Sequence, residues 1–404
     1  MLIWGHHSFG ISLDSAPHRL VNHQSQITQS PILLLTCDRI QTMNMLEQMA
    51  AQDHEQVIAF QNNAVGLRGI LAIHDTTCGP ALGGVRILRY ASEDEALNDA
   101  LRLSRGMTYK AAISELPCGG GKCVILLREE MKRAEAFEAY GQLVESLHGR
   151  FFTGRDVGIT DGDLQAIARA TTYVAKEPDA ALGDVSEHTA IGVWHGMRAC
   201  LEFAGLLKSG KKIRVAIQGV GSVGLLLGRI LKREGCELIV ADVNPERAAE
   251  AAKELSARVV APTEILSADC DVLAPCALGG VLDAATVARV QARIICGCAN
   301  NQLATPEAGD ELARRGIVYA PDYLVNAGGL IRGAEYFLLR CADSQPSLAR
   351  IYDRMLRVLQ LAQERRASTA RMADELAESR LNRAKTFRDL HWGGAASRSS
   401  KIDT

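Results

Sequence analysis

The chain has 404 residues, of which 47% are hydrophobic, and a formal net charge of −2. This length exceeds what one hydrophobic core usually supports, so it predicts two domains. The near-neutral charge gives no electrostatic case for binding nucleic acid or an anionic membrane, and no apolar run approaches the ~18 residues that span a bilayer.

The cysteines and the first 42 residues do not indicate a metal site or a secretory signal. Eleven cysteines are scattered without a CxxC pair or a histidine cluster beside them, so we expect no metal site and a reducing, cytoplasmic location. Residues 1–42 lack the charged start, long apolar core and cleavage site of a secretory signal. We expect a disordered extension there, or a translation start at Met43 or Met45.

Regular patterns begin near Met45, with candidate strands at 57–60 and 67–73. Residues 74–86 combine Gly-Pro and Gly-Gly pairs, which predict a turn whose backbone can approach a small ligand. Ser92 and Glu95 form a capping box, and the apolar spacing after them predicts a helix that ends near Gly106.

Two lysines follow this predicted helix. Lys122 comes directly after three glycines and before the apolar run 123–127, which predicts a loop-to-strand junction, and Lys110 lies shortly before it. Like charge and partial burial both lower the pKa of a lysine toward the range where an amine acts as acid or base near neutrality. The two residues are therefore candidates for catalysis, and the alternative is that they are surface lysines beside a glycine-rich turn.

A carboxylate candidate follows in the next unit of the chain. Residues 134–148 have helical spacing, 151–152 predict a strand, and Asp156 lies in the loop between Gly154 and Gly158. Asp156 is either a catalytic carboxylate or an ordinary turn residue. The turn at 178–184 is the expected approach to a hinge.

The second half contains a dinucleotide fingerprint in its full context. A strand at 213–217 leads into a GxGxxG turn and a helix, and a second strand at 237–241 ends at Asp242. The glycines bring backbone N–H groups and the positive helix end against a pyrophosphate, and Asp242 can accept hydrogen bonds from ribose hydroxyls. The acid favours NAD over NADP, although the nearby Arg247 keeps the alternative open.

Further strands are expected near Val259 and at 271–273, 293–296 and 317–319. The segments 274–279 and 297–303 each follow the carboxyl end of a strand, where open parallel sheets bind their ligands. Asn300 is therefore a candidate for a nicotinamide or substrate contact, or a turn former.

Eight motifs occur in this order along the chain: HDTTCGPALGG, ALRLSRGMTYKAA, GGGKCVI, DVGIT, GVGSVG, APCALGG, GCANNQL and YAPDYLVNAGG. Together they resemble the leucine/phenylalanine/valine dehydrogenase branch of the glutamate dehydrogenase superfamily, closest to the leucine dehydrogenases, over roughly residues 45–387. The resemblance implies an α/β protein with an N-terminal catalytic and oligomerisation domain (43–178) and a Rossmann-like, doubly wound NAD domain (179–368). A C-terminal helix and tail (369–404) would pack back on the first domain.

The resemblance also implies roles for single residues. Lys122 and Asp156 would be catalytic, and Lys110 would bind the substrate carboxylate. Other substrate contacts are expected at Leu82, Gly83, Gly84, Met107, Gly154, Asn300, Leu330 and Gly333. Cofactor contacts are expected at Thr189, Gly219, Val220, Gly221, Ser222, Val223, Gly224, Asp242, Val243, Cys276, Ala277 and Asn300.

The implied activity is the NAD-dependent, reversible oxidative deamination of an apolar, leucine-like L-amino acid by a homo-oligomer. Gly154 and Gly333 replace larger residues of the leucine enzymes, so phenylalanine or tryptophan is the alternative substrate. Glutamate would need a cation for its second carboxylate, and Arg155 is the one candidate. A non-catalytic NAD-binding homologue is a further alternative.

Overall fold

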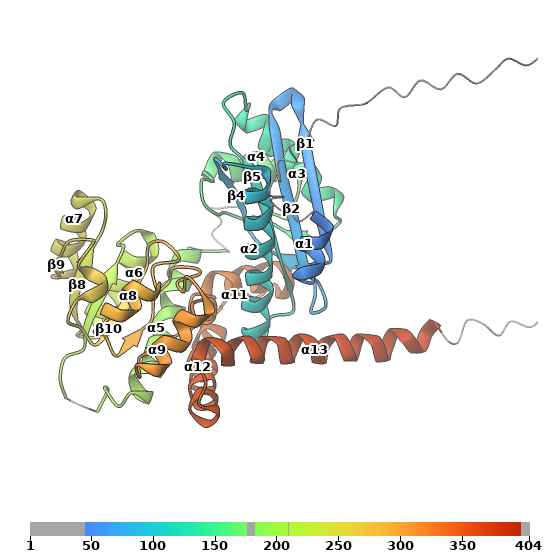
Figure 1. Ribbon diagram of the computed structural model, residues 1–404. Coiled ribbons are helices and arrows are strands. Elements are labelled where there is room, and N and C mark those ends of the chain that lie inside the picture. Colours follow the sequence, from blue (N-terminus) through green and yellow to red (C-terminus); the bar gives the residue numbers. More distant parts are fainter. Residues whose placement is uncertain (1–44, 176–181, 209, 397–404) are drawn as a thin grey trace, which may run out of the picture. The chain divides into compact units, whose positions relative to one another are not determined.

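The computed structural model describes residues 45–175, 182–208 and 210–396, with side chains up to residue 387. The predicted N-terminal extension lies outside these residues, as does most of the predicted turn at 178–184. Within the described residues, no helix is both long and apolar enough to cross a membrane. The chain builds two sheets, each with helices on both faces (Figure 1).

The first sheet is mixed, in the order β1-β2-β5-β3-β6, with β4 also pairing with β5. β1 and β2 are antiparallel, as are β2 and β5, whereas β3 and β4 run parallel to β5. The strands are β1 (Gln56–Asn62), β2 (Leu67–Asp75), β3 (Ala81–Leu82), β4 (Val85–Leu88), β5 (Gly119–Leu126) and β6 (Phe151–Phe152).

Side-chain alternation along β2 and β5 divides the apolar residues of this sheet between two helical layers. Leu71 and Ile125 point to the layer of α3 (Arg133–Ser146) and α4 (Asp161–Ala170). Residues next to them, such as Ala72, point to α2 (Glu93–Ile113), which lies along the opposite face (Figure 1).

The second sheet is parallel, in the order β12-β11-β10-β7-β8-β9, which is the Rossmann strand order. Its strands are β7 (Arg214–Gln218), β8 (Glu237–Ala241), β9 (Arg258–Val259), β10 (Val272–Pro275), β11 (Ile294–Ile295) and β12 (Val318–Tyr319). Val215 and Ile217 share one core with α5, α6 and α12, while Ala216 between them faces α8 and α9.

The helices of this half are α5 (Val185–Phe203), α6 (Ser222–Arg233), α7 (Pro245–Leu255), α8 (Ala284–Arg289), α9 (Pro306–Arg314), α10 (Asp322–Val325), α11 (Gly328–Ala334), α12 (Gln345–Arg365) and α13 (Thr369–Ala396). A short helix α1 (Met45–Ala51) precedes β1, 3₁₀ turns lie at η1 (Asn63–Val65) and η2 (Ile265–Ser267), and a π-helical turn, η3 (Glu335–Leu339), follows α11.

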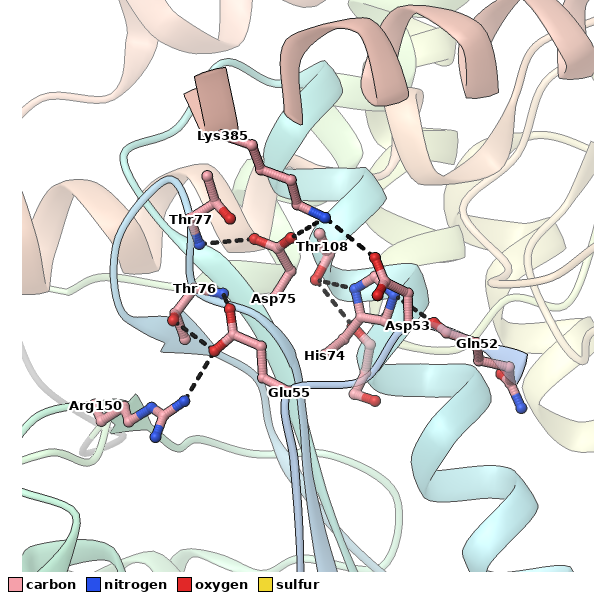
Figure 2. A network of polar contacts seen from close by, with 11 residues as sticks. Gln52, Asp53, Glu55, His74, Asp75, Thr76, Thr77, Thr108, Arg150 and Lys385 are labelled. Carbon is pink, nitrogen blue, oxygen red and sulfur yellow. Dashed lines mark hydrogen bonds and ion pairs between the residues drawn. The ribbon is translucent and has the colours of Figure 1, made fainter. Parts of the chain in front are cut away.

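The C-terminal helix α13 returns to the first sheet, as expected. Lys385 places its Nζ 3.1 Å from Asp53 and 3.5 Å from Asp75, which is the last residue of β2 (Figure 2). Farther back on α13, Glu378 accepts a hydrogen bond of 2.7 Å from the hydroxyl of Tyr109 on α2. The α/β class, the Rossmann-like second half and the returning helix are thus confirmed.

Two predicted boundaries are wrong. Helix α2 does not end at Gly106 but runs to Ile113, so Lys110 lies in its last turn. Strand β5 begins at Gly119, so Lys122 lies inside a buried strand and not at a loop-to-strand junction. Both lysines are consequently held by regular backbone hydrogen bonding.

Candidate active site

Lys122 and Asp156 form a close ion pair. Lys122 is buried in β5, and its Nζ lies 2.5 Å from Oδ2 of Asp156, in the loop after β6. Neither side chain exposes more than 18% of its surface. In a buried pair of this kind, each group offsets part of the cost of removing the other from water.

Arg86 holds the same carboxylate from the neighbouring strand β4. Its Nε lies 3.1 Å from Oδ2 of Asp156, and its Nη1 lies 3.1 Å from Asp99 on α2, which also accepts from Tyr90. Burial raises the pKa of Asp156, but the cations of Lys122 and Arg86 outweigh burial and leave this pKa below its usual range. Asp156 is therefore a carboxylate at neutral pH.

Sequence reasoning missed Arg86. The one local signal is that it lies between Val85 and Ile87, the two buried residues of a short strand that follows Gly83 and Gly84. Its carboxylate partners lie 13 and 70 residues away along the chain, so no local pattern joins them.

The glycines around this pair serve close packing of the protein itself. A Cβ on Gly83 would lie 1.7 Å from the carbonyl oxygen of Gly121, and one on Gly84 would lie 2.7 Å from that of Arg155. A Cβ on Gly121 would meet the ring of Phe151 at 2.7 Å. These glycines bring β3, β4 and the Asp156 loop against β5, and so they set the position of the ion pair.

Lys110 connects the first sheet to the second. Its Nζ donates to Oδ1 of Asn300 at 3.2 Å, and the side chain of Asn326 donates to the same oxygen at 2.8 Å. The pKa of Lys110 is lowered to about 8, mainly by burial and also by the charge of Lys122, while Asp322 opposes this decrease. Asn326, which fixes Asn300, was not among the predicted site residues.

Two of the remaining predicted substrate residues lie in an apolar cluster. Leu82 and Leu330 belong to one apolar cluster with Phe152, and Met107 lies on α2 one turn before Lys110. A Cβ added to Gly333 would meet nothing within 4 Å. A Cβ added to Gly154 would meet only the Cβ of Ala175, at 3.3 Å.

The glycine-rich turn after β7 has the geometry that a dinucleotide requires. Gly219 has a φ of +89°, and its missing Cβ would lie 2.7 Å from that of Ala277 at the end of β10. A Cβ on Gly224 would lie 2.1 Å from the oxygen of Gly219, whereas one on Gly221 would meet nothing within 4 Å. Helix α6, which starts with Ser222 and Val223, has no side-chain cap at its N-terminus. Its N–H groups therefore fit a pyrophosphate.

Asp242 supports this turn from the end of β8. Its Oδ2 accepts the N–H of Val220 at 3.0 Å, and Nη1 of Arg247 lies 3.4 Å from its Oδ1. The next residue, Val243, is 88% exposed. Asp242 is the acid expected to discriminate between NAD and NADP. Because Arg247 contacts Asp242, both NAD and NADP stay chemically compatible with this edge of the sheet.

Two further predicted cofactor residues lie near these elements. Cys276 has its Cβ 3.2 Å from the position of a Cβ on Gly224, so it lies against the start of α6. Thr189 donates to the carbonyl of Val185 at 2.8 Å, and its hydroxyl lies 3.1 Å from the position of a Cβ on Gly329. The region described by the structure contains no group of three or more His, Cys, Asp or Glu residues that could hold a metal ion.

Comparisons with known proteins agree with this geometry. Residues 54–178 match the family model "Glu/Leu/Phe/Val dehydrogenase, dimerisation domain", and residues 240–336 match "Glutamate/Leucine/Phenylalanine/Valine dehydrogenase". An L-tryptophan dehydrogenase from Nostoc punctiforme is 44% identical over 347 residues, covering 85% of this chain and 98% of that protein. The chain belongs to the Glu/Leu/Phe/Val dehydrogenase family.

Other members of the family are about equally similar. A leucine dehydrogenase from Geobacillus stearothermophilus is 43% identical and covers 86% of this chain and 95% of that protein. A phenylalanine dehydrogenase from Bacillus thermotolerans is 40% identical, covering 88% and 95%. The crystal structure of L-tryptophan dehydrogenase from Nostoc punctiforme has a TM-score of 0.72 and 43% identity, covering 84% of this chain and 99% of that one.

These relatives make the protein an amino-acid dehydrogenase, and hence an oxidoreductase of a family that uses NAD or NADP. The predicted resemblance is confirmed. Because three substrate classes occur among relatives of similar identity, identity alone does not choose among leucine, phenylalanine and tryptophan.

Proposed function

We propose that this dehydrogenase catalyses the NAD-dependent, reversible oxidative deamination of an apolar L-amino acid to its 2-oxo acid and ammonia. One observation carries the proposal: the buried pair of Lys122 and Asp156 lies close enough to Lys110 for their charges to interact. Lys110 in turn contacts Asn300, which follows a strand of the second sheet. Two cations and one carboxylate are what this chemistry needs.

Each of the three groups has a separate task. The ammonium of Lys110 binds the substrate carboxylate. Bound NAD supplies the hydride acceptor. Lys122 polarises the oxygen of the water that adds to the substrate iminium and exchanges protons with it, and Asp156 takes and returns the proton of the amine. Because Lys122 and Asp156 are already hydrogen-bonded, a proton can pass between them without rearrangement of either side chain.

A leucine-like side chain fits the apolar residues near this site. Leu82, Leu330 and Phe152 offer an apolar surface without a cation of their own. The aromatic alternative also has a specific observation in its favour, because the space beside Gly333 is open and would accept a larger side chain. We place leucine-like substrates first and phenylalanine or tryptophan second.

Separate observations support the cofactor, the assembly and the location. Asp242 disfavours a 2′-phosphate, which supports NAD. The family description of residues 54–178 as a dimerisation domain supports a homo-oligomer. The ten described cysteines are all free, which supports a reducing, cytoplasmic environment.

A substrate panel tests the proposal. Purified protein is assayed for NADH and NADPH formation with leucine, isoleucine, valine, phenylalanine, tryptophan and glutamate, and for the reverse reaction with the matching 2-oxo acids and ammonia. We expect turnover with at least one apolar amino acid and NAD. Binding of NAD without turnover of any substrate would identify a non-catalytic homologue, and faster turnover of glutamate than of any apolar substrate would also contradict the proposal.

A further inference from the structure

A basic cavity lies away from the site described above. It has a volume of about 410 Å³ and is formed by α12, α13 and the C-terminal end of α2. Its charged lining consists of five arginines and two carboxylates: Arg350, Arg354, Arg357, Arg380, Arg383, Glu115 and Asp353. None of these residues belongs to the lysine–aspartate site or to the glycine-rich turn. We call this cavity the arginine pocket.

Helical spacing produces the arginine pocket. Arg350, Arg354 and Arg357 follow one another at four and three residues on α12, so they share one face of that helix. Arg380 and Arg383 are three residues apart on α13 and face the same cavity. Apolar residues of α2 and α13, among them Ile113 and Leu376, complete the lining.

The protein compensates only part of the positive charge in the arginine pocket, because two carboxylates face five arginines. Arg354 donates one nitrogen to Glu115 at 3.2 Å, but its Nη1 is buried without any hydrogen-bond partner among the described residues. An unpaired buried donor is destabilising, and more so when the group is charged. Arg350, Arg357 and Arg383 form no ion pair in the part of the chain that the structure describes.

The positive charges of the arginine pocket also act on one another. Burial lowers the pKa of Arg354, and the guanidinium groups of Arg350 and Arg380 add to this decrease, while Glu115 opposes it. A bound anion would relieve this repulsion and supply acceptors to the buried guanidinium.

We propose that the arginine pocket binds a small polyphosphate anion, of the size of pyrophosphate or larger. Guanidinium groups bind phosphate oxygens in pairs of parallel hydrogen bonds, so several arginines facing one cavity suit a ligand with more than one phosphate. The cavity volume of about 410 Å³ also lies in the range of small-molecule sites and exceeds what a single phosphate fills.

A ligand in the arginine pocket would join three helices. Arg380 already donates to the carbonyl oxygens of Ala112 and Leu116, at 3.0 and 2.9 Å, at the end of the helix that carries Lys110. An anion held by Arg350 and Arg357 of α12 and by Arg383 of α13 would tie these helices to each other. We therefore expect the ligand to raise the melting temperature.

The test measures binding and does not depend on enzymatic activity, so it fails or succeeds separately from the proposed function. The full-length protein, first saturated with NAD to fill the dinucleotide turn, is titrated calorimetrically with pyrophosphate, tripolyphosphate and orthophosphate at constant ionic strength. Melting curves are recorded in parallel. We expect saturable pyrophosphate binding at least tenfold tighter than that of orthophosphate, and a higher melting temperature.

The variant Arg350→Gln/Arg357→Gln removes two exposed charges of the arginine pocket and should weaken pyrophosphate binding at least tenfold. The control Arg258→Gln/Arg289→Gln removes two exposed charges elsewhere and should bind as the unaltered protein does. Arg383→Gln serves as a second variant if the first unfolds. Absence of saturable binding, equal affinity for orthophosphate and pyrophosphate, or equal losses in variant and control would each overturn the proposal.

Discussion

The charges of Lys122 and Asp156 depend on each other because both groups are largely out of water. Removing one partner of a buried pair costs about 3–5 kcal/mol when nothing else compensates the other. Without Lys122, Asp156 would still be paired with Arg86. A variant of Lys122 or Asp156 therefore affects both catalysis and folding, so each experiment needs a measurement that reports on the fold alone. Binding of NAD to the glycine-rich turn is such a measurement, because this turn lies on the other sheet.

We predict that Lys122→Met lowers kcat by about 10²–10⁴-fold, which is the usual contribution of an acid–base group. NAD binding, followed by fluorescence titration, should stay within a few-fold of the unaltered protein because no residue of the turn changes. Lys253→Met, an exposed lysine on α7, is the matched control. A Lys122→Met enzyme with near-normal turnover would refute the catalytic role.

Arg86 provides a test of how Asp156 is kept ionised. Because the guanidinium lowers the pKa of Asp156, Arg86→Gln should raise that pKa. If the carboxylate is the active form, the acidic limb of the profile of kcat/KM against pH moves to higher pH. Arg68→Gln, which removes an exposed pair with Glu93, should leave the profile unchanged. An unshifted acidic limb in Arg86→Gln would show that Arg86 does not set this ionisation.

At the scale of elements, the sequence predicted what local patterns determine. Short stretches of sequence encode the alternating strands, the glycine turn and the acid after β8. Short stretches also identified Lys110, Lys122 and Asp156 as candidates. The predicted end of α2 at Gly106 was wrong because tertiary contacts determine where this helix ends. Beyond Gly106, the helix is held by the contact of Tyr109 with Glu378, 269 residues away. Such partners cannot be inferred from one sequence.

Helix α11 gives a test of substrate choice. Because a Cβ at Gly333 meets nothing within 4 Å, Gly333→Val should fold and should fill the open space. If this space holds the substrate side chain, kcat/KM should fall by about 10–200-fold for phenylalanine or tryptophan and much less for valine. The control Gly162→Val adds the same side chain on the exposed surface of α4. Equal losses for large and small substrates would place Gly333 outside the substrate pocket.

At the scale of the whole molecule, the junction of α1, the hairpin, α2 and α13 contains two buried histidines. His74 forms hydrogen bonds with Thr108 and with the carbonyl of Gln52 (Figure 2). Its ring lies 4.7 Å from that of His54. The pKa of His74 is lowered to about 4, mainly by burial and also by the neighbouring His54. Both rings are consequently neutral in the folded protein near neutral pH.

This burial predicts how stability depends on pH. As the pH falls below about 6.5, an unfolded histidine takes up a proton, whereas folded His74 does so only near pH 4. The unfolded state is favoured over this interval, so His74 should cost about 2 kcal/mol of stability between pH 7 and pH 5. Urea unfolding at the two pH values measures the loss. His74→Gln, which cannot titrate, should lose less stability than the unaltered protein, while the exposed His148→Asn should behave as the unaltered protein does. If His74→Gln showed the same loss as the unaltered protein, the acid sensitivity would have to arise at other groups, and the neutral histidine pair would not be its origin.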